Sequence, residues 1–171
     1  NIPLRSLALL GAYYRFNCDW REAINAVAEL LSVDERHKVE TATDKRMHLI
    51  GLLEDGVFLP TEDDINEVPK EAEFYGLWLT NNLPSAEIIE QINNETILKN
   101  KVKLIKKELA KRSPVANMFA IKAIEEADVL LFLPTTLESN MGSALIVEEI
   151  GGAIVGSNAL KICLPNAVKE N

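Results

Sequence analysis

The sequence contains few of the residues that most directly reveal chemistry. Its 171 residues include only two cysteines, Cys18 and Cys163, and two histidines, His37 and His48. The histidine spacing matches none of the usual zinc-ligand patterns. Two cysteines cannot build a disulfide framework, and Cys163 falls in a predicted buried strand, so we expect two reduced thiols, as in cytosolic proteins. The chain also lacks a G-x-S-x-G nucleophile motif and a glycine-rich phosphate fingerprint.

Basic residues and long hydrophobic runs are also scarce. The 18 lysines and arginines are outnumbered by 26 aspartates and glutamates, which gives a formal charge of −8. Such a surface repels phosphate groups, which argues against nucleic acid and anionic membrane as general partners. No run approaches the roughly 20 apolar residues of a membrane span, and nothing resembles a signal peptide. We therefore expect a cytoplasmic protein, with 47% hydrophobic residues forming the core of a single α/β domain over residues 1–171.

The stretch from residue 123 to residue 166 organises the chain. Two short apolar runs, Val129–Leu133 and Leu160–Leu164, flank a segment with helical spacing, Ser143–Val155. This order predicts a βαβ unit with parallel strands buried on both faces. Ligands of such sheets bind beyond the carboxyl ends of the strands, where the hydroxyl-rich loop Thr135–Asn140 precedes the helix. The loop is a candidate anion site, although composition alone favours a simpler role in capping the helix.

The rest of the chain supplies helices and further strands. An αα-hairpin is predicted over residues 4–31, with Asp19 as a cap, and a lysine-rich helix over Ile97–Arg112. Ser113-Pro114 is predicted to begin another helix. Strands are predicted at Lys38–Thr43, Met47–Leu53, Val57–Leu59 and Phe74–Thr80, with a turn at Asp55-Gly56. We expect Phe74–Thr80 to lie parallel to the two apolar runs in one sheet. The acidic residues of 54–64 could gather Mg²⁺ and the lysine-rich helix could dock an acidic partner, but solvated surfaces explain both.

Several segments occur in the order of a known family. Asp19–Ile24 matches D-[FW]-x-E-A-I, Ala123–Asp128 matches A-I-x-x-A-D, and Lys161–Asn166 stands in the place of K-x-Y-V-x-N. Between them, Pro134–Asn140 and Ser143–Val147 stand in the places of P-G-S-L-Y-T-S and an N-L-L-V helix. On these segments the chain resembles the CofD-like family, which includes 2-phospho-L-lactate transferase and the YvcK-type gluconeogenesis factors. The resemblance spans most of the chain, as the C-terminal part of a longer domain.

The resemblance implies a Rossmann-like parallel sheet with flanking helices and a small β-hairpin insertion. It implies binding of a nucleotide-linked metabolite of the UDP-sugar type, in a regulatory role in central carbon metabolism or in cell-wall precursor supply and cell shape. One alternative is 2-phospho-L-lactate transfer in coenzyme F420 biosynthesis, with Mg²⁺ as a cofactor. Another is a degenerate member that binds a protein through the basic helix. The ligand-binding residues implied are Thr135, Thr136, Glu138, Ser139, Asn140 and Asn166.

The chain departs from the family pattern within that loop. Thr135 and Thr136 replace glycine and serine, and Glu138 replaces tyrosine. A β-branched residue restricts the backbone, and a carboxylate repels a diphosphate. The chain also begins at Asn1, without the family's first strand and glycine-rich loop. We expect a piece of a longer domain, with an exposed apolar edge that promotes formation of homo-oligomers.

Overall fold

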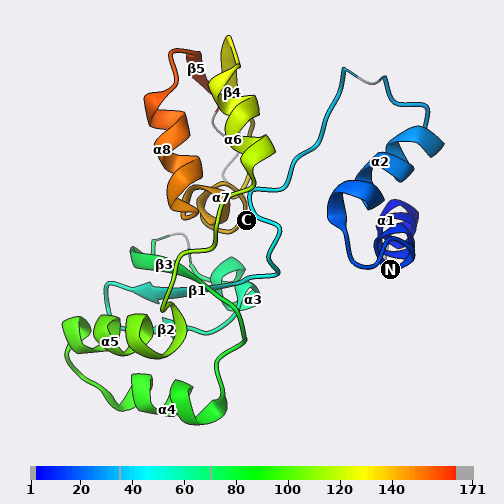
Figure 1. The fold of residues 1–171 in the computed structure, drawn as a ribbon. Helices are drawn as coiled ribbons and strands as arrows, with labels where there is room; N and C mark the ends of the chain where they lie inside the picture. The colour runs from blue at the N-terminus through cyan, green and yellow to red at the C-terminus, as the bar shows by residue number, and fades with distance from the viewer. Residues whose placement is uncertain (1–2, 35, 70, 165–171) are drawn as a thin grey trace.

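A computed structural model describes residues 3–34, 36–69 and 71–164. Figure 1 shows three groups of elements along the chain. The first is a helical hairpin of α1 (Leu4–Arg15) and α2 (Trp20–Leu30). The second contains β1 (His48–Leu53), β2 (Phe58–Leu59), α3 (Glu62–Asn66), β3 (Phe74–Thr80), α4 (Ala86–Asn94), α5 (Leu98–Leu104) and the π-helix η1 (Ile105–Leu109). The third contains α6 (Met118–Glu125), β4 (Val129–Phe132), the π-helix η2 (Leu137–Gly142), α7 (Ser143–Leu145), α8 (Glu148–Gly156) and β5 (Leu160–Cys163). None of the helices in these ranges is both long and apolar enough to cross a membrane.

The α1–α2 hairpin follows from local signals. Asp19 caps α2 by accepting hydrogen bonds from the backbone N–H groups of Arg21 and Glu22, at 2.9 and 3.1 Å. The rings of Tyr13 and Trp20 stack with their centroids 4.1 Å apart. Arg21 then links the hairpin to the rest of the molecule, because its guanidinium lies 3.4 Å above the Phe119 ring in α6. The predicted hairpin is therefore confirmed.

The central sheet is antiparallel, with the strand order β2-β1-β3. The turn between β1 and β2 contains Gly56 at φ +89°, a conformation that glycine adopts without strain. The prediction that Phe74–Thr80 lies parallel to β4 and β5 is wrong, because β3 pairs with the whole of β1. A segment rich in aromatic and β-branched residues can pair in a parallel or an antiparallel sheet. Here the β1–β2 hairpin, which is close in sequence, provides the partner strand of β3.

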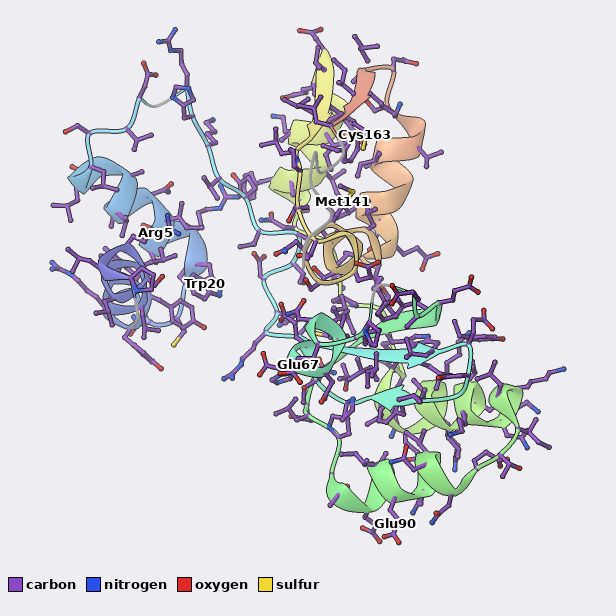
Figure 2. All side chains as sticks on the ribbon, turned by 180° about the vertical axis from the view of Figure 1, so that it is seen from behind. Arg5, Trp20, Glu67, Glu90, Met141 and Cys163 are labelled. Atoms are coloured by element: carbon purple, nitrogen blue, oxygen red, sulfur yellow. The ribbon has the colours of Figure 1, made fainter. Side chains whose placement is uncertain are left out.

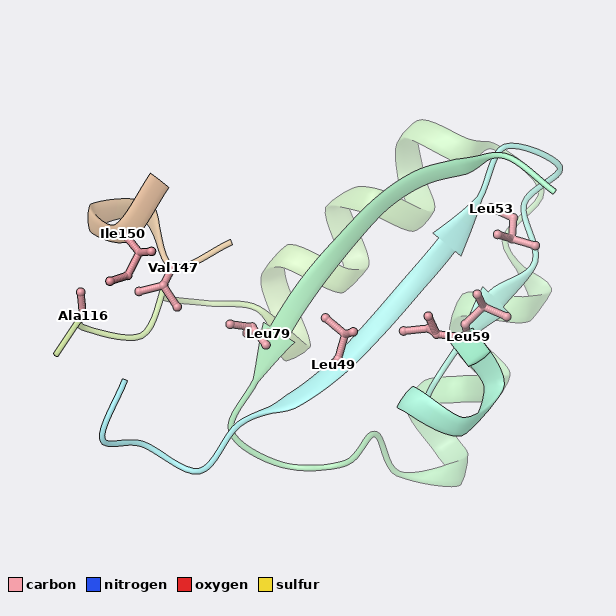
Figure 3. Packing of buried hydrophobic residues seen from close by; sticks show 8 residues of the cluster. Leu49, Leu53, Leu59, Leu79, Ala116, Val147 and Ile150 are labelled. Carbon is pink, nitrogen blue, oxygen red and sulfur yellow. The ribbon is translucent and has the colours of Figure 1, made fainter. Parts of the chain in front are cut away.

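Both faces of the antiparallel sheet are covered. One face carries a cluster of buried residues that come from the sheet, from α3, from the segment before α6 and from the start of α8: Leu49, Leu53, Leu59, Ile65, Leu79, Ala116, Val147 and Ile150. Figure 3 shows this cluster, which joins the second and third groups of elements. On the other face, Ile50, Leu52 and Phe58 pack against Ile92 of α4 and Ile105 of η1. The sheet thus fixes the position of the lysine-rich helix, which packs through its apolar stripe.

The second sheet contains β4 and β5, which pair in parallel with Val129 opposite Leu160 and Phe132 opposite Cys163. With the helix between them, this is the predicted βαβ unit. The predicted α/β class, with a parallel sheet, flanking helices and a small β-hairpin, is confirmed. The expected burial is wrong, because Val129 and Leu131 are exposed while Leu130 and Phe132 are half-buried. Only one face of β4 is covered, and Cys163 is exposed rather than buried. Neither Cys18 nor Cys163 forms a disulfide in the described structure.

Three predicted boundaries differ from the structure. Residues 38–43 form no strand; instead, the carbonyl of Ala42 accepts a hydrogen bond from the Asn117 N–H at 2.9 Å. Ser113-Pro114 begins no helix, because Asn117 is the residue that caps α6, through the N–H of Phe119. The predicted helix Ser143–Val155 breaks into α7 and α8 at Val147, whose side chain is buried in the core. In each case a long-range contact overrides a local signal.

Candidate functional site

The predicted ligand loop forms a compact turn at the carboxyl end of β4. Residues 137–142 are the π-helix η2, which continues into α7. The hydroxyl of Ser139 donates to the Thr136 Oγ1 at 3.0 Å, and the side-chain amide of Asn140 donates to the same oxygen. The Ser143 hydroxyl donates to the Asn140 carbonyl at 2.9 Å. The structure therefore brings Thr136, Ser139 and Asn140 together in one hydrogen-bonded turn.

The surroundings of this turn differ from the prediction in one respect. No anion-binding helix begins at Ser143, because the helical backbone already starts at Leu137 and α7 itself has three residues. Figure 2 marks the turn at Met141, below the parallel sheet and above α3. Thr135 and Glu138 are half-buried and Ser139 is buried. Asn166, the remaining predicted ligand residue, lies outside the described residues.

An acidic groove of about 650 Å³ lies between α6 and α8. Its carboxylates are those of Glu125, Asp128 and Glu149, and its floor includes Gly152 and Gly156. A Cβ at either glycine would meet no atom within 4 Å, so neither position requires glycine for close packing. At Gly151, by contrast, a Cβ would lie 3.1 Å from the Leu145 carbonyl oxygen, so glycine permits the close approach of α8 to α7. The acidic groove repels phosphate and does not suit an anionic ligand.

A basic groove of about 740 Å³ lies where β3, the segment after η1 and the start of α8 meet. We define it by Trp78, Lys106, Lys111, Arg112 and Glu148, which line it together with small and apolar residues. Sequence reasoning missed this groove, because the lysines were interpreted as a solvated helical face. Trp78 lies in β3, remote in sequence from these lysines, so the sequence did not indicate that it lines the same groove.

The described residues offer no metal site. No three histidine, cysteine, aspartate or glutamate side chains within the described ranges converge closely enough to hold an ion. Asp64 uses its carboxylate in a capping box with Thr61, where it accepts from the Thr61 N–H at 3.0 Å. Part of the acidic segment around α3 thus has a structural role, because Asp64 caps the helix. For the Mg²⁺ that a transferase would use, the described residues therefore show no cluster of three such side chains.

Comparisons with known proteins identify the family. The family model of 2-phospho-L-lactate transferase CofD matches residues 3–171. The fold is similar to the crystal structure, at 2.60 Å resolution, of BH3568 from Bacillus halodurans, a member of the UPF0052 family, with a TM-score of 0.66 and 23% identity. A second X-ray structure of BH3568 gives the same values. The similarity covers 95% of this chain but only 41% of the B. halodurans chain. The search of curated proteins gave no match. Since the family model matches almost the whole chain, this chain belongs to the CofD family.

Proposed function

We propose that the η2 turn forms part of a binding site for a nucleotide-linked metabolite. The observation that carries this proposal is the convergence of Thr136, Ser139 and Asn140 directly after the carboxyl end of β4. In open α/β sheets ligands bind in the crevice at this end of the strands. Hydroxyl and amide groups are suitable donors for phosphate oxygens once their hydrogen bonds within the turn rearrange. The protein would perform this function in the cytoplasm.

Two functions of such a site are supported by different observations. The description of the matching family favours transfer of 2-phospho-L-lactate in coenzyme F420 biosynthesis. Binding of a UDP-sugar for regulation is the other function, and it does not require the turn to carry out catalysis at the positions where Thr135, Thr136 and Glu138 depart from the family pattern. Phosphoryl-type transfer needs cations that neutralise developing negative charge, and Mg²⁺ commonly supplies them. No metal-assisted step is assigned to this chain.

Substitution of Glu138 tests the binding proposal. Glu138→Tyr restores the family's residue and removes a carboxylate from the half-buried side of the turn. We expect UDP-glucose to bind several-fold more tightly, because removal of one like charge changes the binding free energy by about 0.5–1 kcal/mol. Glu138→Gln separates the effect of charge from that of the ring, and Glu90→Gln, on the exposed face of α4, controls for net charge.

Isothermal titration calorimetry at fixed salt measures these affinities. Equal affinities for the natural chain and Glu138→Tyr would show that the ligand does not contact this turn. Absence of binding in all variants would reject a nucleotide site in this chain and would favour the protein-interaction alternative. Mass spectrometry of a mixture with a phospholactate donor, the F420 precursor and Mg²⁺ distinguishes the two functions, because only the transferase forms the joined product.

A further inference from the structure

We propose that the outer face of α1 in one copy of the chain docks on the uncovered face of the β4–β5 sheet in a second copy, and that the contact is reciprocal. Such a dimer contains the same contact twice, related by a two-fold axis. Neither the η2 turn nor the basic groove takes part in it. The proposal therefore does not rest on the function proposed above.

The first surface is the uncovered face of the parallel sheet. Paired residues of neighbouring strands share a face of the sheet, and side chains alternate between faces along each strand. The observed register gathers exposed apolar side chains on one face: Val129, Leu131, Leu133, Leu160, Ile162 and Leu164. Parallel sheets in stable α/β folds are covered by helices on both faces. This face therefore lacks the helical layer that its composition requires.

The second surface is the outer face of α1. The inner side of the helix packs on α2, where Tyr13 stacks on Trp20. The outer side is a stripe with helical spacing, which we call the α1 stripe: Leu4, Leu7, Gly11 and Tyr14. Its three large side chains are 82%, 48% and 68% exposed, in chain order. A Cβ at Gly11 would meet no atom within 4 Å, so the middle of the stripe is open to a close approach.

The anchor of the hairpin indicates that the partner is a second copy. Among the described residues, the hydrogen bonds, ion pairs and ring contacts between the hairpin and the rest of the chain all involve Arg21, which meets Glu40 and Phe119. Figure 1 shows the hairpin apart from both sheets. Arg21 holds α2 at the start of α6 and leaves the α1 stripe exposed. Another molecule can therefore reach the stripe without breaking a contact within either chain.

The two surfaces also match in size and chemistry. The 12 residues of α1 span about 18 Å, enough to cross strands of four residues, which are about 13 Å long. Neither surface contains a charged side chain, so docking removes no ion from water. The exposed apolar side chains of one contact offer on the order of 1,000 Å², and the reciprocal contact doubles this to about the area that a stable dimer needs.

Sedimentation equilibrium of surface variants tests the contact. Leu7→Glu places a charge in the α1 stripe, and Leu131→Lys places one in the sheet face. Each should weaken dimerisation by at least about tenfold, because the two-fold symmetry puts the charge into both contacts. The matched controls are Leu83→Glu and Val155→Lys, which replace exposed apolar residues outside both surfaces and should dimerise like the natural chain.

An equimolar mixture of Leu7→Glu and Leu131→Lys is the decisive sample. Their heterodimer has one contact between two natural surfaces, and its other contact contains two new charges of opposite sign. The mixture should therefore regain dimers that neither variant forms alone. Tyr14→Glu with Ile162→Lys provides a second pair for the same comparison. All these positions are exposed, so circular dichroism should show natural helix content in each variant.

The pattern of dissociation separates this contact from other kinds of association. Loss of dimers in both surface variants, retention in the controls and recovery in the mixture support the proposal. Dissociation of Leu131→Lys alone would show that two sheet faces pair with each other, and dissociation of Leu7→Glu alone would show that two hairpins pair. Either result overturns the proposal, as does a natural chain that stays monomeric at its highest soluble concentration. Equal loss in the controls would indicate non-specific association and reject the contact.

Discussion

Lys101 provides the sharpest test of how the lysine-rich helix is held. Its side chain is only 7% exposed, in contrast to its neighbours Lys99 and Lys103, which are exposed. The ammonium Nζ donates a hydrogen bond to the carbonyl oxygen of Gly56 at 2.8 Å. Lys101 therefore ties α5 to the turn between β1 and β2. The interpretation of this helix as a wholly solvated lysine face is wrong at this residue.

The expected cost of Lys101→Met follows from this geometry. Methionine is unbranched and of similar length, so it retains most of the packing of the lysine stem. It cannot donate to the Gly56 carbonyl, and hydrogen bonds that involve a charged group contribute about 1.5–3 kcal/mol. The half-buried carbonyl regains some hydration, which reduces the loss. We expect the free energy of unfolding to fall by about 1–2 kcal/mol.

Urea denaturation followed by circular dichroism measures this change. Lys99→Met and Lys103→Met serve as controls, because both remove the same charge from exposed positions of the same helix and should change stability by less than about 0.5 kcal/mol. The m-value should be the same in all variants, so that the midpoint alone reports stability. A Lys101→Met protein as stable as the two controls would refute the structural role assigned to this lysine.

Two further predictions concern pH and association. Hydrogen bonds from the backbone N–H of Ile97 and, to a lesser extent, Thr96 lower the pKa of Glu95 below its ordinary value of 4.5. The ionised Glu95 therefore stabilises the fold above that pH, and this stabilisation is lost as the pH falls through the lower pKa of the folded state. In urea titrations, the Glu95→Gln protein should lose less stability on acidification than the natural chain. Parallel profiles of stability against pH for both proteins would contradict this. The exposed side chains of Val129, Leu131 and Ile162 leave one face of the parallel sheet uncovered, so the chain is expected to self-associate and Leu131→Lys to reduce the mass seen by light scattering. A natural chain that is monomeric at all concentrations would show that this face needs no cover.

Local signals in the sequence predicted the parts of the fold that depend on neighbouring residues. Asp19 caps α2 as its position suggested, and the hydroxyl groups of Ser85 and Thr61 cap α4 and α3 through backbone N–H groups three residues away. The Asp55-Gly56 pair makes the expected turn. These features need only a hydrogen bond or a backbone conformation within a few residues, so sequence spacing is sufficient to predict them.

The family could also be recognised from the sequence, because ordered motifs such as Asp19–Ile24 and Ala123–Asp128 survive where single residues diverge. The position of the candidate turn followed from the βαβ pattern, which places the loop after β4 at the carboxyl end of the strand. The hydrogen bonds that join Thr136, Ser139 and Asn140 did not follow from it, because they depend on the π-helical path of the backbone.

The sequence by itself therefore determined the helix caps, the hairpin turn, the parallel crossover and the family. The tertiary structure alone decided that β3 pairs with β1, that Val147 interrupts the helix after the turn, and that Lys101 is buried. It also brought Trp78 beside Arg112 in the basic groove. These outcomes depend on which surfaces pack together across tens of residues. An apolar strand or a lysine side chain has the same local preferences with any of several partners, and only the packed core selects among them.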